Sequence, residues 1–376
     1  MNDEQKLWEK EFLEKIYIKR KKNIETIKSL YPYTTKDGRY DNFNPGRFGW
    51  TCGFWGGIQW LLYEYGKEAC FFEKAKTCTD DVIKALSEFL PLCHDLGFQF
   101  FPTAVKGYRL TGDERCRTVA LHAATLLAGR FNPVGKFIRA WDVENNAYRG
   151  NTAGLAIIDC MMNLSLLYWA GREIGDPRFA HIANAHADTT MRTFVRDDGS
   201  VNHIVIYNTN NGEIIDKPRG QGYAEGSSWT RGQAWAIYGF TETYENTGKK
   251  EYLDTALKVC KYFIDAMGNK NVPPIDFKQP CDVDYIDTTA GVIAASGMMM
   301  LKKHVSKEDA EIIEEVVVRL LKGAYENCSF DLDEDSILQN GSELYHREDA
   351  RHLPIIYGDY YLIETLLLRG REAGDI

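Results

Sequence analysis

Apolar residues recur at three- and four-residue spacing through most of the 376-residue chain, and this period constrains the fold most strongly. Such spacing places apolar side chains on one face of a helix, so it predicts amphipathic helices. The clearest segments are residues 80–93, 114–131, 156–175, 251–268 and 310–328. Alternating stretches are rare, and residues 201–208 are the clearest candidate for a short hairpin. Because neither a βαβ rhythm nor a glycine-rich nucleotide fingerprint occurs, we predict an all-α fold with little sheet.

Four joints between predicted helices share one plan, in which an aromatic-rich helix ends at a glycine and a charged residue precedes the next helix. The glycines are Gly66, Gly112, Gly175 and Gly248. Glycine supplies the left-handed backbone that ends a helix, and Asp113 or Asp176 can cap the helix that follows. The joints are unequally spaced, unlike a solenoid with a fixed period. The pattern predicts a closed ring of helical hairpins, an (α/α)6 barrel, with long loops forming a cleft on one face.

The composition narrows the class of protein. Hydrophobic residues make up 44% and charged residues 26% of the chain, as in globular proteins. The net charge of −9 argues against nucleic acid as a partner, because phosphate binding needs clustered Lys and Arg. No Pro- or Gly-rich linker divides the chain, so we predict a single domain over residues 1–376, with residues 1–40 as an N-terminal helical segment.

Several signals are missing from the sequence. The N-terminal segment has no uninterrupted apolar stretch of the secretory type, and no segment is long and apolar enough to span a membrane. The nine cysteines are odd in number and contain no CxxC pair, which favours reduced cysteines in a cytoplasmic protein. No HExxH or comparable spacing occurs, so we expect no metal site.

Five segments between the predicted hairpins are rich in Trp, Tyr and Gly beside isolated polar residues. They are residues 46–60, 94–98, 139–145, 219–235 and 357–361, and six of the eight tryptophans lie in or beside them. Aromatic walls next to polar groups hold sugar rings, because the CH faces stack while the hydroxyls form hydrogen bonds. The alternative is that these tryptophans pack between hairpins, as we expect for Trp60. The cluster as a whole favours a sugar-binding cleft.

Two aspartates lie in apolar surroundings, Asp159 at the start of an apolar helix and Asp95 beside His94. Burying an unpaired carboxylate is costly, so each is hydrogen-bonded, caps a helix or keeps a raised pKa for proton transfer. Paired carboxylates across a cleft are typical of glycosidic chemistry. His203 lies in the predicted hairpin. Arg231 either pairs with a structural acid or receives an anionic substrate group, and we favour the second.

Several motifs together resemble a known family. GFWGGIQWLLYEY, HDLGF, IIDCMMNLSLLYWA, GSSWTRGQAWAIYGF and YGDYYLIE occur in this order. In order and spacing they resemble the unsaturated glucuronyl hydrolases, glycoside hydrolase family 88, over about residues 45–370. The first 40 residues carry little of the resemblance.

The resemblance implies a bacterial enzyme with an (α/α)6 barrel and no cofactor. Its substrate would be a glycosaminoglycan oligosaccharide that carries a 4,5-unsaturated uronic acid left by a lyase at its non-reducing end. The enzyme would hydrate the vinyl ether instead of attacking the anomeric carbon. By motif, Asp159 would be the general acid that then activates water, and Asp95 would assist. The implied substrate-binding residues are Trp50, His94, Trp141, His203, Gln221, Arg231 and Trp235.

Other functions remain open at this level. An unsaturated rhamnogalacturonyl hydrolase would use the same barrel and chemistry on pectin fragments. A sugar epimerase on the same barrel would need paired catalytic histidines, for which His94 and His203 are the candidates. In a non-catalytic carbohydrate-binding protein the tryptophans would matter and the aspartates would not. The stretch at 341–354 lacks the serine- and lysine-containing motif of relatives that prefer sulfated substrates, although Arg219 keeps such a preference open.

Overall fold

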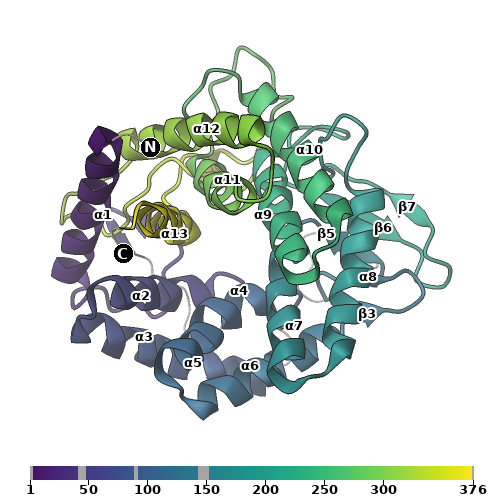
Figure 1. Cartoon of the computed structure of the whole chain (residues 1–376), viewed down its shortest axis with the longest axis horizontal. Helices are drawn as coiled ribbons and strands as arrows, with labels where there is room; N and C mark the ends of the chain where they lie inside the picture. The colour runs from purple at the N-terminus through teal and green to yellow at the C-terminus, as the bar shows by residue number, and fades with distance from the viewer. Residues whose placement is uncertain (1–2, 41–47, 89–91, 143–151, 375–376) are drawn as a thin grey trace.

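A ring of helical hairpins makes up the protein in the computed structural model (Figure 1). The structure describes residues 3–40, 48–88, 92–142 and 152–374, so parts of the aromatic segments 46–60 and 139–145 lie outside the described residues. The inner helices are α2 (Cys52–Gly66), α4 (Leu96–Phe100) continued by α5 (Lys106–Thr111), α7 (Cys160–Ile174), α9 (Thr230–Thr247), α11 (Thr288–Leu301) and α13 (Ile356–Ala373). The outer helices are α3 (Ala69–Val82), α6 (Glu114–Ala128), α8 (Pro177–Thr193), α10 (Lys250–Met267), α12 (Lys307–Glu326) and α1 (Asp3–Asn23).

Each inner helix is followed by its outer partner, except that α13 packs against α1 from the other end of the chain. The predicted (α/α)6 barrel is therefore confirmed, and the N-terminal helical segment supplies its twelfth helix. Between α4 and α5 the chain forms a π-helical turn, Phe101–Val105. Pro102 in this turn has no backbone N–H, so the regular hydrogen-bond ladder is interrupted there.

Inner and outer helices differ in burial, as a ring requires. Every residue of α11 except Met300 is buried, because the helix has neighbours on all sides. In α10 the buried residues form one stripe that includes Tyr252, Val259 and Phe263. The prediction at 80–93 was wrong in its bounds, since α3 ends at Val82 and a 3-10 turn, Ile83–Ser87, follows.

A helix ends at each of the four predicted glycine joints, and three of the glycines have the predicted left-handed backbone. Gly112, Gly175 and Gly248 follow their helices in the left-handed region, with φ of 72°, 67° and 69°. At the first joint Lys67 takes that conformation instead, with φ of 56°. Gly66 has another reason to be glycine, because a Cβ there would lie 2.0 Å from the hydroxyl oxygen of Tyr17 on α1.

The described strands are few and short. Two hairpins pair β1 (Thr35–Lys36) with β2 (Arg39–Tyr40) and β3 (Phe131–Asn132) with β4 (Phe137–Ile138). A three-stranded antiparallel sheet has the order β5 (Leu155–Ile157), β6 (Ile204–Tyr207), β7 (Ile214–Asp216). The hairpin predicted around 201–208 is confirmed. Residues 156–157 were expected to be helical, but they pair with β6 and helix α7 begins at Cys160.

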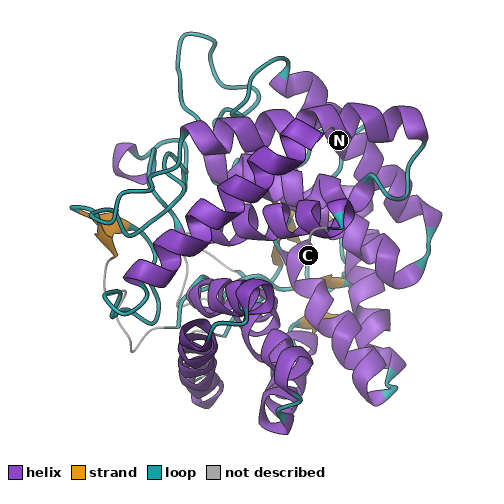
Figure 2. Ribbon diagram, turned by 60° about the vertical axis from the view of Figure 1, so that its left-hand side comes forward, coloured by secondary structure: helices purple, strands orange, loops and turns teal. Residues whose placement is uncertain are grey.

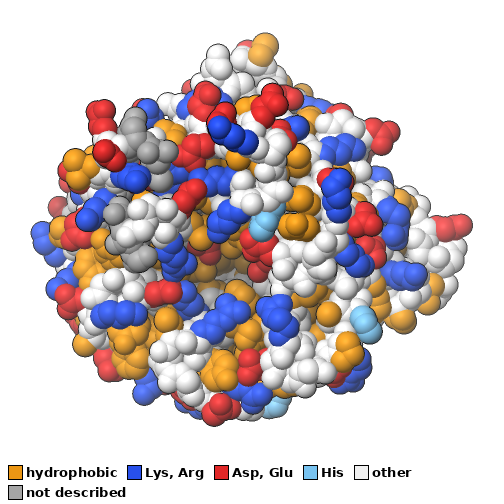
Figure 3. Space-filling view, in the orientation of Figure 1, with side chains coloured by type: hydrophobic (Ala, Val, Ile, Leu, Met, Phe, Trp, Pro, Cys, Tyr) orange, Lys and Arg blue, Asp and Glu red, His pale blue; other side chains and the backbone are white. Residues whose placement is uncertain are grey.

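The long connections leave the ring on one side, as Figure 2 shows. The face of Figure 3 is hollowed near its centre, and its basic side chains alternate with acidic ones instead of forming one patch. Every helix in the described part of the chain is too short or too polar to cross a bilayer.

Candidate active site

A cavity of about 970 Å³ lies where the N-terminal ends of the inner helices meet. Its walls include Asp95 and Asp159, which directly precede α4 and α7, and Arg231 in the first turn of α9. Because the ring aligns the inner helices, residues far apart in sequence meet at this one end. The volume is within the range of about 300–1,000 Å³ typical of small-molecule sites.

Both aspartates occupy helix N-cap positions, but neither side chain forms a capping hydrogen bond. Their carboxyl groups line the cavity instead. Asp95 is 6% exposed, and the side chain of Asp159 is 13% exposed. Among the described residues, no group hydrogen-bonds to Oδ1 of Asp159. Asp159 therefore presents an oxygen that is available for proton transfer.

Burial raises the pKa values of both carboxyl groups above their ordinary range. Burial is the main reason why the pKa of Asp159 rises to about 7; the charge of Arg231 opposes the rise, and the negative charge of Asp95 adds to it. Burial also raises the pKa of Asp95 to about 6, opposed by a hydrogen bond from Cys93 and by Arg130. Between pH 6 and pH 7, Asp159 is therefore mainly protonated while Asp95 is mainly ionised, the division that an acid and a charge-stabilising carboxylate need.

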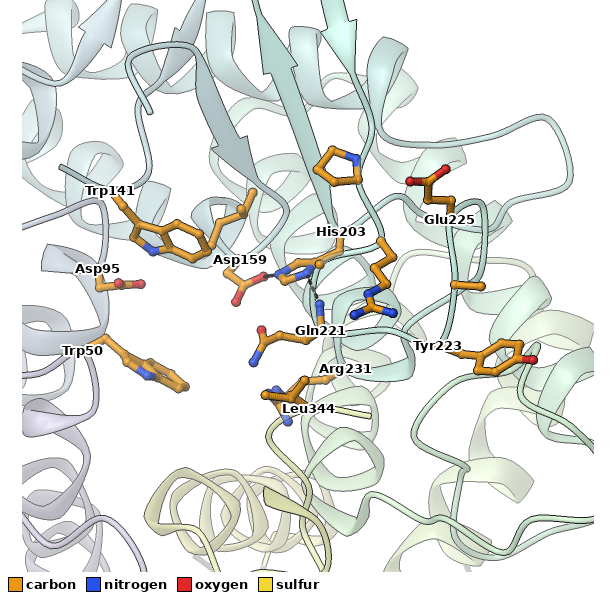
Figure 4. Close-up of a pocket in the computed structure, with 15 residues that line it drawn as sticks. Trp50, Asp95, Trp141, Asp159, His203, Gln221, Tyr223, Glu225, Arg231 and Leu344 are labelled. Atoms are coloured by element: carbon orange, nitrogen blue, oxygen red, sulfur yellow. Dashed lines mark hydrogen bonds and ion pairs between the residues drawn. The ribbon is translucent and has the colours of Figure 1, made fainter. Parts of the chain in front are cut away.

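His203 lies beside Asp159, with its Nε2 3.8 Å from Oδ1 (Figure 4). Its Nδ1 accepts a hydrogen bond from the backbone N–H of Gln221 at 3.0 Å. Burial and the charge of Arg231 lower the pKa of His203 to about 3, so the ring is neutral. Because Nδ1 accepts, the ring proton is on Nε2 and faces Asp159. Gln221 also lines the cavity and donates its side-chain amide to the carbonyl of Glu343 at 2.8 Å.

Arg231 lines the cavity, but its guanidinium already has protein partners. Nη1 pairs with Asp287 at 3.1 Å and Nη2 donates to the carbonyl of Glu343 at 2.9 Å. The guanidinium also lies 4.4 Å from the ring centre of Trp229, whose other neighbour is the ring of His203 at 4.3 Å. Of the two roles considered for Arg231, the structure shows the one that we favoured less: Arg231 pairs with a structural acid, Asp287.

Trp50 and Trp141 line the cavity, as expected of aromatic walls (Figure 4). Trp235 and His94 are not among the residues that line the cavity, so their contact with substrate stays a prediction. Trp235 is fully buried against Phe98, with ring centres 5.2 Å apart. His94 is also fully buried, with its Nε2 3.4 Å from Oδ1 of Asp95. Both therefore support the site from within the core.

Several residues that line or support the cavity were not predicted from the sequence. Tyr223, Glu225 and Leu344 line the cavity without having been singled out. The first two lie in the aromatic segment 219–235, which was the available signal, whereas no sequence pattern marks Leu344. Asp287 was also missed, although the order Asp-Thr-Thr-Ala at 287–290 is typical of an N-cap, and its Oδ1 does accept from the N–H of Thr289. The described residues hold no group of three or more potential metal ligands.

Comparisons with known proteins agree with one another. A model of Glycosyl Hydrolase Family 88 matches residues 23–246. The unsaturated glucuronyl hydrolase of Bacillus sp. (strain GL1) is 32% identical over 353 residues, covering 92% of each chain. Its solved structure, described as responsible for the degradation of glycosaminoglycan, aligns over 99% of this chain and 97% of that chain at 30% identity, with a TM-score of 0.86.

Streptococcal relatives match as well. The unsaturated chondroitin disaccharide hydrolase of Streptococcus pneumoniae is 30% identical and covers 94% of this chain and 90% of its own length. A variant of the unsaturated glucuronyl hydrolase of Streptococcus agalactiae, solved in complex with dGlcA-GalNAc6S, is 26% identical. That match covers 97% of this chain and 91% of that one, with a TM-score of 0.82.

Proposed function

The chain belongs to glycosyl hydrolase family 88, and we propose that it releases 4,5-unsaturated uronic acid from the non-reducing end of lyase-generated glycosaminoglycan oligosaccharides. The relatives named for unsaturated glucuronyl and chondroitin disaccharide substrates support this substrate class. The observation that carries the proposal is the pair of cavity-lining aspartates, one of which has a pKa of about 7.

The proposed reaction begins with proton transfer from Asp159 to C4 of the sugar. Positive charge then develops at C5 and on the ring oxygen, where the ionised Asp95 stabilises it. Water adds to C5 and gives its proton to the Asp159 carboxylate, which regenerates the acid. The resulting hemiketal opens, and the remaining hemiacetal collapses to release the neighbouring sugar as an alcohol.

Other residues in the cavity have supporting roles in this proposal. The Nε2–H of neutral His203 faces Asp159 and holds the carboxyl group toward the sugar after the proton has left. Trp50 and Trp141 provide the apolar faces against which the rings stack. Arg231 directs its remaining donors to the uronate carboxylate while Asp287 fixes its position.

The alternatives fit the cavity less well. An epimerase would need two histidines facing the sugar, whereas His94 is buried outside the lining and His203 is the histidine of the cavity wall. A binding protein would have no use for two carboxyl groups held at such cost beside the tryptophans.

For the cellular location we propose the cytoplasm, supported by the nine cysteines, all of which have free thiols.

The decisive experiment follows the ultraviolet absorbance of the conjugated double bond when the protein meets lyase-generated disaccharides. The wild type is expected to abolish the band, and Asp159→Asn to lose at least about 100-fold in kcat, since general acid catalysis contributes about 10²–10⁴-fold. Isothermal titration should show that the variant still binds the substrate. Full activity of Asp159→Asn would overturn the mechanism, and an unchanged band with the wild type would overturn the function. Chondroitin, heparin and pectin disaccharides, sulfated and plain, compared side by side, distinguish this enzyme from a pectin-specific one.

A further inference from the structure

The thiol of Cys93 lies directly against Asp95. Its Sγ is 2.8 Å from Oδ2, and both residues are buried. Burial and the neighbouring Asp95 hold the pKa of the Cys93 thiol well above its usual range, so the sulfur keeps its hydrogen. The thiol therefore donates and the carboxylate accepts. Among the described residues, this is the one side chain that hydrogen-bonds to the Asp95 carboxylate.

The segment that carries the thiol is held from both sides. Nη1 of Arg130 donates to the carbonyl of Leu92 at 3.1 Å, and the N–H of His94 donates to the carbonyl of Ala140 at 3.1 Å. Arg130 also pairs with Asp142 at 3.0 Å, beside the wall residue Trp141. The position of Cys93 is thus fixed relative to the cavity.

We propose that Cys93 is a positioning residue for the reaction, and that its S–H donor keeps Asp95 ionised and turned toward the substrate. The inference rests on the proposed function. A donor to the charged form of a carboxyl group favours ionisation, and a donor to Oδ2 also fixes rotation about the Cβ–Cγ bond. The other oxygen, Oδ1, remains for the developing positive charge.

The other groups around Asp95 cannot replace the thiol. The titratable or charged groups that face Asp95 are Cys93, His94, Arg130 with its partner Asp142, Asp159, Cys160 on α7 and Cys52 on α2. His94 is neutral, because burial lowers its pKa well below the usual range, and its Nε2 lies 3.4 Å from Oδ1 without forming a hydrogen bond. Arg130 acts from a distance and already pairs with Asp142. Asp159, Cys160 and Cys52 contribute no positive charge.

The consequence extends to Asp159. The negative charge of Asp95 helps Asp159 to keep its proton. If Asp95 lost its donor and took up a proton in part, the charge opposite the reacting carbon would weaken, and the proton on Asp159 would be held less firmly. Cys93 therefore maintains the difference in protonation between Asp95 and Asp159, and the proposed mechanism depends on this difference.

Three substitutions separate the effect of the hydrogen-bond donor at position 93 from the effect of side-chain volume. Cys93→Ser keeps a donor, Cys93→Ala removes it, and Cys93→Val removes it while filling the space. Cys260→Ala, at a fully buried cysteine on the outer helix α10, is the matched control for lost volume. Circular dichroism and thermal unfolding establish which variants are folded before kinetics are compared.

The readout is the acid limb of kcat/KM against pH, which reports ionisation in the free enzyme. For Cys93→Ala and Cys93→Val we expect this limb to move up by about one pH unit and kcat/KM at pH 6 to fall about fivefold. Cys93→Ser and Cys260→Ala should keep the wild-type limb. An acid limb that stays in place in both Cys93→Ala and Cys93→Val would overturn the proposal, as would a limb that moves equally in Cys93→Ser.

A second readout does not depend on activity. The infrared S–H stretching band of Cys93, isolated as the difference between the wild type and Cys93→Ser, should lie at the low frequency of a hydrogen-bonded thiol. It should shift upward when pH falls through the ionisation of Asp95. A band that is insensitive to pH and has the frequency of a free thiol would refute the inference even in an active enzyme. The expected band in a protein that leaves the unsaturated disaccharides intact would refute the proposed function alone.

Discussion

Asp95 and Asp159 occupy the same local position, one residue before an inner helix, where aspartate usually caps the helix. Asp113 and Asp176 are true caps in the same chain: each carboxylate accepts a hydrogen bond from the backbone N–H of the residue two positions later. A helix N-terminus favours a nearby anion by about 0.3–1 kcal/mol, which is less than full burial of a carboxylate costs. The carboxyl groups that turn into the cavity therefore keep raised pKa values despite the helix ends beneath them.

These two pKa values predict a bell-shaped dependence of kcat/KM on pH. In the proposed mechanism, activity requires ionised Asp95, with a pKa of about 6, and protonated Asp159, with a pKa of about 7. We expect a maximum between these values and a fall of about tenfold per pH unit on either side, with the two limbs belonging to the coupled pair. The measurement is the initial rate at low substrate from pH 4 to pH 9. A rate that keeps rising above pH 8 would contradict the role of Asp159 as the acid.

A second prediction at this scale concerns Gly220. Its φ is +63°, and a Cβ there would lie 1.8 Å from Nδ1 of His203. Gly220→Ala should displace the neighbouring N–H of Gln221 from His203 and lower kcat on the order of 100-fold, as a shift of about 1 Å can. Gly226→Ala is the control in the same loop, because its φ is +69° but a Cβ would meet nothing within 4 Å. Equal kinetics for both variants would show that backbone strain alone accounts for the loss.

At the scale of elements, the sequence predicted the helices well because their period is a local property. It predicted the site less completely because long-range contacts carry no local signal. Residues 156–157 read as the start of a helix, and only pairing with β6 makes them a strand. Arg231 and Asp287 are 56 positions apart, so the pattern left the partner of the arginine open. Trp235 resembles a wall residue by composition, yet its helix face points into the core.

The attachment of α1 to α13 yields a prediction for a pair of elements. Arg369 on α13 is buried and donates to both carboxylate oxygens of Glu9 on α1 at 2.9 Å, and to Glu314 on α12 at 2.7 Å. Arg369→Met leaves Glu9 buried without its cation, so we expect a loss of about 3–5 kcal/mol in the free energy of unfolding. Urea denaturation measures this.

The matched control is Lys250→Met, which breaks an exposed pair with Asp254 and should cost below about 1 kcal/mol. The folded fraction of Arg369→Met should keep its kcat, because the helix end that carries this ion cluster is not part of the cavity lining. Equal stability losses in the two variants would mean that α1 is held by its apolar contacts and not by the ion cluster.

At the scale of the whole molecule, the cavity depends on closure of the ring. Trp50 precedes α2, Asp159 precedes α7, Arg231 begins α9, and its partner Asp287 precedes α11. No single hairpin holds both carboxyl groups together with the cation. The fold thus gathers partly buried charge at one end of the barrel, and that arrangement reduces stability in order to keep the pKa values raised.

The last prediction concerns how the free energy of unfolding depends on pH because Asp159 is buried. The pKa of Asp159 is about 7 in the folded protein against an ordinary value of 3.8, so folding takes up a proton between these pH values. The contribution of Asp159 is therefore fully present below about pH 4, and the free energy of unfolding falls as pH rises toward 7. Asparagine resembles the protonated acid and does not ionise, so Asp159→Asn should lack this fall.

The variant should have nearly wild-type stability at pH 4 and exceed it at pH 8 by up to about 4 kcal/mol, at about 1.36 kcal/mol per pKa unit. Urea denaturation of both proteins at intervals from pH 4 to pH 8 measures the difference. Buried neutral His186, with a pKa of about 3, destabilises both proteins equally in acid and cancels in the comparison. Asp188→Asn, at an aspartate on outer helix α8 that accepts from the hydroxyl of Tyr252, is the control for an amide substitution outside the cavity. A stability difference that stays constant with pH would mean that Asp159 does not hold a proton in the folded enzyme, and would remove the physical basis of its role as the acid.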